Sequence, residues 1–217
     1  RATLAGAEPD TAPGAHCDAP FPCEFAGYCH AALPPVPEWP VSVLPHGGGK
    51  RWIEQGVVDL LAVDPAALTN AVHARVHRAT VSGEVYHDVE GARAAMAGWA
   101  FPRTWLDFET IGFAVPRWIG TRPYQQVPFQ FSAHVETADG VIMHREFLSL
   151  DGGDPRRACA EALVEIVPPT GAVIGYNASF EKGRILELAA AFPDLADSLS
   201  AMAARVVDLL PVTRANW

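Results

Sequence analysis

The chain has 217 residues, 49% of them hydrophobic and 19% charged, and its formal net charge is −9. This length and composition predict one or two packed domains and exclude a disordered chain. The negative charge argues against a protein that coats nucleic acid, but it is compatible with an acidic site neutralised by metal ions. No apolar run reaches membrane-spanning length and no signal peptide opens the sequence, so we expect no membrane contact and a cytoplasmic, reduced setting. Because the sequence does not begin with Met and stops just after an apolar run, we expect a fragment of a longer protein.

Three of the four cysteines lie close together in a proline-rich segment, residues 1–33. Cys17, Cys23 and Cys29 are each separated by five residues, and a histidine adjoins each of the outer two. Three thiolates and one histidine would complete a Zn²⁺ site. A [4Fe–4S] cluster needs a fourth cysteine, which would have to lie upstream of this sequence. Free thiols or a disulfide are the plain alternative.

Residues 34–102 are expected to form a proline-rich linker followed by a small helical unit. This unit resembles the helix-hairpin-helix-like connectors of RecB-type nucleases, which can touch a nucleic-acid backbone through Gly and Lys; a spacer is the alternative. The predicted elements are helices over 47–55, 65–78 and 90–98 and a short strand over 83–87.

Residues 103–217 alternate between strand and helix patterns, which predicts a mixed α/β sheet with helices packed on it. Asp139-Gly140 between two alternating runs is a strong hairpin signal. The predicted strands cover 104–111, 127–137, 141–150, 172–176 and 205–210, and the predicted helices cover 155–167, 177–191 and 194–203.

Two carboxylates stand two residues apart on the first of these strands. Asp107 and Glu109 point to the same face, where their charges repel unless a cation lies between them. Glu181 follows a short apolar strand and joins them if that strand lies beside the first, with Asn177 expected to cap its helix. Oxygen ligands suit Mg²⁺ or Mn²⁺, and two ions about 4 Å apart would activate water and stabilise a leaving oxygen. An exposed polar strand face is the alternative.

The same residues carry a family resemblance. The run from Asp107 to Thr110 (D-F-E-T) resembles the first motif of the DnaQ-like, or DEDD, 3′–5′ exonucleases. The run from Asn177 to Glu181 (N-A-S-F-E) is similar to their second motif, with Glu in place of the usual Asp. Over residues 103–217 the resemblance implies a ribonuclease H-like mixed sheet flanked by helices. It also implies two-metal hydrolysis of phosphodiester bonds at single-stranded ends of DNA or RNA.

A closer resemblance is carried by residues 122–130 (RPYQQVPFQ) and the preceding cysteine cluster. They look like an uncharacterised bacterial family in which a RecB-like nuclease domain with a cysteine-bound iron–sulfur cluster precedes a DnaQ-like domain of unknown function. The resemblance implies that residues 1–33 are the tail of the upstream nuclease domain. Residues 103–217 would then be the exonuclease domain, truncated at its C-terminal side.

The third motif of the exonucleases is not evident. It supplies a final Asp preceded by His or Tyr four or five residues earlier, and no such pair follows Glu181. Asp208, near the last strand, matches a family position and is a candidate metal ligand; otherwise the fourth acid would lie beyond Trp217. Without that acid, the competing hypothesis is a catalytically inactive nuclease-fold module that binds nucleic acid or a partner protein.

Several residues near the motifs are expected to contact substrate. Arg122 would hold a phosphate through paired N–H donors, or would be a surface arginine that orders its loop. Phe113, Trp118 and Tyr124 in the same loop would stack on bases or cover an edge of the core. The residues assigned to substrate binding are Thr110, Arg122, Gln126, Asn177 and Phe180.

Overall fold

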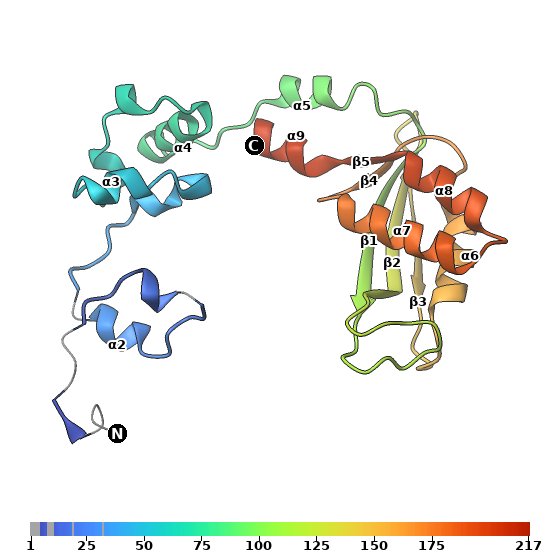
Figure 1. Ribbon diagram of the computed structural model, residues 1–217. Coiled ribbons are helices and arrows are strands. Elements are labelled where there is room, and N and C mark those ends of the chain that lie inside the picture. The colour runs from blue at the N-terminus through green and yellow to red at the C-terminus, as the bar shows by residue number, and fades with distance from the viewer. Residues whose placement is uncertain (1–4, 8–10, 19, 32) are drawn as a thin grey trace. The chain divides into compact units, whose positions relative to one another are not determined.

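The computed structural model describes residues 5–7, 11–18, 20–31 and 33–217. It divides into two compact units, Arg1–Val85 and Tyr86–Trp217, and each is described by itself (Figure 1). None of the helices in the described part of the chain combines the length and apolar character that crossing a membrane requires.

The first unit consists of short helices, and the later ones contain a small core. Six buried side chains form that core: Val41, Leu44, Trp52, Leu60, Val63 and Leu68. The helices are η1 (Ala15–Cys17), α2 (Ala26–Ala31), η2 (Val41–Val43), η3 (Pro45–Gly47), α3 (Lys50–Glu54), η4 (Leu60–Ala62), η5 (Pro65–Ala67) and α4 (Ala71–Ser82).

The helix predicted over 65–78 is divided in two. Asp64 caps η5, since its carboxylate accepts from the Ala66 N–H at 2.9 Å. Asn70 then caps α4 by accepting from the N–H groups of Val72 and His73. The strand predicted over 83–87 is wrong, because this segment is irregular and begins with a glycine in the left-handed conformation that ends α4.

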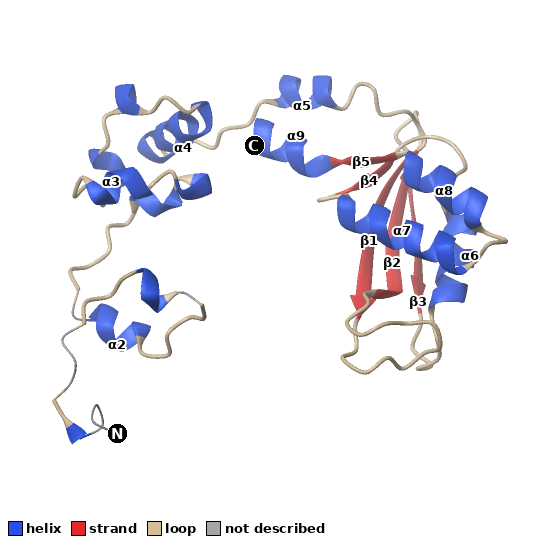
Figure 2. Ribbon diagram, viewed as in Figure 1, coloured by secondary structure: helices blue, strands red, loops and turns tan. Residues whose placement is uncertain are grey.

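The second unit is a mixed five-stranded sheet flanked by helices, with strand order β3-β2-β1-β4-β5 (Figure 2). The predicted mixed α/β fold class is therefore confirmed, as is the hairpin at Asp139-Gly140, where Gly140 has φ +83°. The elements are α5 (Val89–Ala95), β1 (Arg103–Ile111), β2 (Val127–Glu136), β3 (Ile142–Leu148), α6 (Arg156–Ile166), β4 (Val173–Gly175), α7 (Ser179–Ala191), α8 (Ala196–Ala204), β5 (Val206–Asp208) and α9 (Leu209–Asn216).

One face of the sheet packs against helices and holds the main core. Leu106 and Phe108 of β1 stand opposite Ala133 and Phe131 of β2, and all four are buried. Side chains from α6, α7 and α8 complete this cluster, and these helices lie together over the sheet in Figure 1. Since strand side chains alternate, the neighbouring positions on β1 face away from the helices.

Candidate functional site

Asp107 and Glu109 occupy those outward positions on β1. Both are exposed, and they stand opposite Ser132 and Gln130 of the antiparallel strand β2. The alternation expected from the sequence is therefore present: Leu106 and Phe108 enter the core and the two carboxylates do not.

Glu181 lies on α7, the helix that follows β4, and β4 is the strand next to β1. β4 lies parallel to β1, with Trp105 opposite Ile174. The strand before Glu181 therefore lies beside the strand that carries Asp107, as the sequence prediction required. β4 ends at Gly175, and the chain turns there into α7. A Cβ at Gly175 would lie 2.8 Å from Glu181 Oε2, so the missing side chain makes room for the carboxylate at the end of the strand.

The Glu181 carboxyl group is in an unfavourable place for a charge. Its side chain is buried, with 4% of the residue exposed, and Oε2 has no hydrogen-bond partner among the described residues. Burial raises the pKa of this carboxyl, its own backbone N–H lowers it, and the charges of Asp107 and then Asp208 raise it further. The net direction is upward, and its causes include the charges of one carboxylate on β1 and one on β5.

Asp208 ends β5 directly beside the end of β4. It pairs with Gly175 across the two parallel strands. Its Oδ1 accepts from the Asn177 N–H at 3.0 Å and from the Leu210 N–H at 2.9 Å, so one oxygen ties the β4–α7 turn to the start of α9. Asp208 is thus the N-cap of α9, a role that needs no metal.

The expected capping role of Asn177 is wrong. α7 begins at Ser179 behind Ala178, and no side chain caps it. Asn177 instead adopts the left-handed backbone conformation, with φ +64°, which Asn tolerates better than most residues. It therefore turns the chain between β4 and α7 and presents its N–H to Asp208.

Arg122 and Gln126 contact α7 and so fix the loop that they belong to. Arg122 pairs with Glu187 at 3.3 Å, while Arg184 donates to both Glu187 and Gln126. The Arg184 side chain is only 12% exposed, so this group anchors the end of the 112–126 loop onto α7. The ion pair of Arg122 with Glu187 fits a role in ordering the loop. Binding of phosphate by Arg122 stays a prediction.

The two remaining substrate-binding candidates lie close to the acids. Thr110 follows Glu109 at a β-bulge in the β1–β2 pairing and is half-buried. Phe180 precedes Glu181, packs against the main core, and has the Arg184 guanidinium 5.2 Å from its ring centroid. Their contacts with substrate stay predictions.

The group of acids fits a divalent cation by its chemistry. Glu181 offers a buried oxygen without a partner, a glycine leaves it space, and Asp107 and Asp208 add oxygen donors. Within the described residues, no three His, Cys, Asp or Glu side chains are already arranged at metal-binding distances. The arrangement is therefore a set of neighbouring acids and not a formed metal site.

The cysteines are all free thiols. Cys17 is buried and Cys23 exposed, and the Cys23 N–H donates to the Cys17 carbonyl at 2.7 Å. Cys29 lies on α2. A zinc or iron–sulfur site at these three residues stays a prediction. Cys159 is in the main core, and burial raises the pKa of its thiol to about 12.

A family model described as a domain of unknown function, DUF2779, matches residues 104–217, from the start of the predicted motif strand to the last residue. The chain belongs to this family. Searches of curated proteins and of solved structures gave no match. The DUF2779 region contains all of β1 to α9 apart from Arg103, and with it Asp107, Glu109, Glu181 and Asp208.

Sequence reasoning missed two residues that shape this part of the DUF2779 region. Gly175 makes room for the Glu181 carboxylate, and its place just before the turn was the available signal. Glu187 pairs with Arg184 three residues earlier on α7, a spacing that the sequence could have shown. Its pairing with Arg122 joins a loop to a helix more than sixty residues later and leaves no local signal.

Proposed function

We propose that the domain formed by Tyr86–Trp217 is a metal-dependent nuclease that hydrolyses phosphodiester bonds at single-stranded ends, in the 3′–5′ direction. The observation that carries the proposal is the buried Glu181 carboxyl, which lacks a partner and lies within the electrostatic influence of Asp107 and Asp208. Holding like charges together costs stability, so a site of this kind is expected where a cation or substrate repays the cost. The D-F-E-T and N-A-S-F-E runs support the same reaction class by resemblance.

In this proposal the residues divide into ligands and positioning groups. Asp107, Glu109 and Glu181 would hold Mg²⁺ or Mn²⁺, with Asp208 as a further oxygen donor. Bound divalent ions supply Lewis-acid polarisation of the phosphate and a hydroxide nucleophile near neutral pH. The chain itself keeps one oxygen donor buried against Gly175 and presents the two β1 carboxylates to solvent, where a strand can approach.

A second candidate function rests on Asp208. Its Oδ1 already accepts two backbone N–H groups, and no metal site is formed among the described residues. An inactive nuclease-fold module that binds nucleic acid or a partner protein would need the same fold and the same Asp208 helix cap. It would not cleave nucleic acid. The two candidates differ in whether strand shortening occurs.

The test incubates the chain with single-stranded DNA or RNA labelled at the 5′ end, in Mg²⁺ or Mn²⁺. The proposal expects a ladder of products shortened from the 3′ end. Asp107→Asn should lower the rate on the order of 100-fold or more, because it removes a charged ligand without changing side-chain size. The matched control is Glu146→Gln, an exposed carboxylate on β3, two strands away on the same face, which should cleave like the unaltered chain.

Thermal unfolding measures metal binding apart from cleavage. Mn²⁺ should raise the Tm of the unaltered chain and of Glu146→Gln, but not that of Asp107→Asn, because a ligand that binds only the folded state stabilises it. A metal-dependent rise in Tm without any strand shortening would reject the nuclease and favour the inactive module. Strand shortening that Asp107→Asn leaves unchanged would reject the assigned site.

A further inference from the structure

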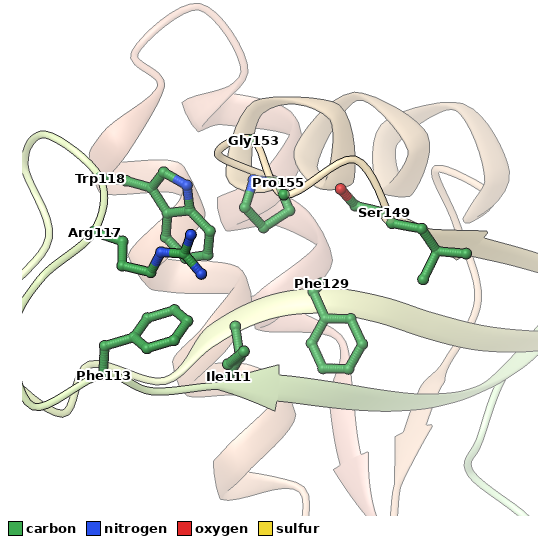
Figure 3. A pocket seen from close by; sticks show the side chains of 10 residues that line it. Ile111, Phe113, Arg117, Trp118, Phe129, Ser149, Gly153 and Pro155 are labelled. Carbon is green, nitrogen blue, oxygen red and sulfur yellow. The ribbon is translucent and has the colours of Figure 1, made fainter.

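An apolar pocket lies close to the acids and outside the group that they form. It has a volume of about 260 Å³ and opens between the ends of β1 and β2, the 112–126 loop and the start of α6 (Figure 3). Its main walls are Ile111, Phe113, Arg117, Trp118, Phe129 and Pro155, and Figure 3 shows the rings of Phe113, Trp118 and Phe129 around one opening. Pockets for drug-sized ligands usually start at about 300 Å³, so this one suits a smaller planar group.

The aromatic wall is held together by its own contacts. The rings of Phe113 and Trp118 meet edge to face, with 5.6 Å between centroids. The Arg117 guanidinium lies 5.2 Å from the Phe113 ring centroid, and Arg117 is exposed. The Tyr124 N–H donates to the Phe113 carbonyl at 2.8 Å, which closes the loop behind these rings.

The loop is fixed at two further places. Arg156, which pairs with Asp154 at the start of α6, donates to the Ile119 carbonyl at 2.7 Å and to the Gly120 carbonyl. At the other end, Gln126 is held by α7 through Arg184. The pocket is therefore formed before any ligand arrives, which lowers the entropy that binding must overcome.

The pocket is close to the acids along the chain. Ile111 is two residues after Glu109 on β1, a distance of roughly 7 Å along an extended strand. The loop that walls the pocket also contacts α7, the helix that carries Glu181. A strand whose phosphate lies at the acids therefore has a neighbouring base within reach of the pocket.

We propose that this pocket is a subsite for one unstacked nucleobase, and that it makes single strands the substrate in preference to duplexes. Aromatic faces stack on any base, and a guanidinium adds cation–π attraction or a phosphate contact without reading sequence. A paired base lies inside its stack and cannot enter, so duplex must first be opened. The inference rests on the proposed function, because it takes the polymer at the acids to be nucleic acid.

The experiment measures binding apart from cleavage. A fluorescent single-stranded oligonucleotide is titrated by anisotropy with Ca²⁺ in place of Mg²⁺, beside a set in which one nucleotide at a time near the 3′ end is abasic. Trp118→Ala should weaken binding of the intact strand by about tenfold to a hundredfold, the loss expected for one stacked base. Trp118→Phe, which keeps a stacking face, should recover most of the affinity.

The matched control is Ile119→Ala, which removes a fully exposed side chain from the same loop and should bind like the unaltered chain. In the unaltered chain, an abasic nucleotide at one position should weaken binding. In Trp118→Ala, the strand that is abasic at that position should bind as well as the intact strand. Three results would each overturn the subsite. Trp118→Ala could weaken binding of the intact and the abasic strands equally, or it could bind with the same affinity as Ile119→Ala. The third such result is that no strand binds at all. Binding that follows the expected pattern without cleavage in Mg²⁺ or Mn²⁺ supports the subsite and rejects only the hydrolysis.

Discussion

The Glu181 side chain keeps a carboxyl group buried beside two other acids, which predicts a particular pH dependence of stability. Because burial and the charges of Asp107 and Asp208 raise its pKa, the folded chain holds this proton more tightly than the unfolded chain. The contribution of this proton to the free energy of unfolding is fully present below the pKa of Glu181 in the unfolded chain. It is lost as pH rises through the pKa of Glu181 in the folded chain.

Glu181→Gln should therefore stabilise the metal-free chain at pH 7 and not at low pH. We expect a higher Tm than that of the unaltered chain at pH 7, and a difference that shrinks towards zero near pH 4. Thermal melts with a chelator present measure it. Glu165→Gln, an exposed position on α6, is the control and should stay within about 0.5 kcal/mol at both pH values. A Glu181→Gln variant that is less stable than the unaltered chain at pH 7 contradicts the account.

Asp208 combines a structural role with a proposed chemical one, and two substitutions separate them. Asp208→Asn keeps an oxygen that accepts from Asn177 and Leu210, so its Tm without metal should change little. Asp208→Ala removes both acceptors and should cost about 1–3 kcal/mol. If Asp208 also binds metal, the Asn variant lowers the Mn²⁺-dependent rise in Tm although its Tm without metal changes little. An unchanged rise in the Asn variant leaves Asp208 as a helix cap only.

At the scale of elements, the turn from β4 into α7 makes the site depend on a glycine. A Cβ at position 175 would lie 2.8 Å from Glu181 Oε2, and the far end of that side chain is free to move away. Gly175→Ala should therefore weaken metal-dependent stabilisation and any cleavage by roughly 10- to 100-fold, with a modest change in Tm. Gly183→Ala, also at a glycine near this turn but inside α7 with nothing within 4 Å, should instead raise stability by about 1 kcal/mol. Equal activity of the two variants would show that the Glu181 position is not critical.

The elements that the sequence predicted well are those with a repeating local pattern. Alternation on β1 separated Asp107 and Glu109 from the core, and the Asp139-Gly140 hairpin joined β2 to β3 as expected. The errors lie where a local signal was weak or had two readings. Asn177 is equally suited to a cap and to a left-handed turn, and only the contact with Asp208 decides between them.

Helix α9 was missed for a related reason. Its start signal is Asp208, which sequence reasoning weighed as a metal ligand and placed inside a strand over 205–210. The strand ends at Asp208, and the next eight residues form the helix. The local sequence could not show that α9 packs against α5, because the two helices are more than one hundred residues apart.

At the scale of the whole molecule, the contact of α5 with α9 sets where the second unit begins. Within that unit, the Asp88 N–H donates to the Asn216 carbonyl at 2.8 Å, and the rings of His87 and Trp217 lie 4.6 Å apart. Arg103 donates to the carbonyls of Trp99 and Met96, so the segment before β1 is bonded to the first strand as well. Residues 86–102 therefore belong to the fold of the second unit, although the family match begins at residue 104 and the sequence reading placed the boundary at 103.

A fragment of residues 86–217 should consequently unfold in one cooperative transition, whereas a fragment of residues 104–217 should be less stable by several kcal/mol. The shorter fragment loses the partner of α9 and leaves its apolar side exposed. Its denaturant m-value should also fall, because less surface is buried on folding. Chemical denaturation of both fragments, followed by far-UV circular dichroism, measures the difference. Equal midpoints would mean that α5 contributes nothing to the domain, and the boundary would then move to the start of β1.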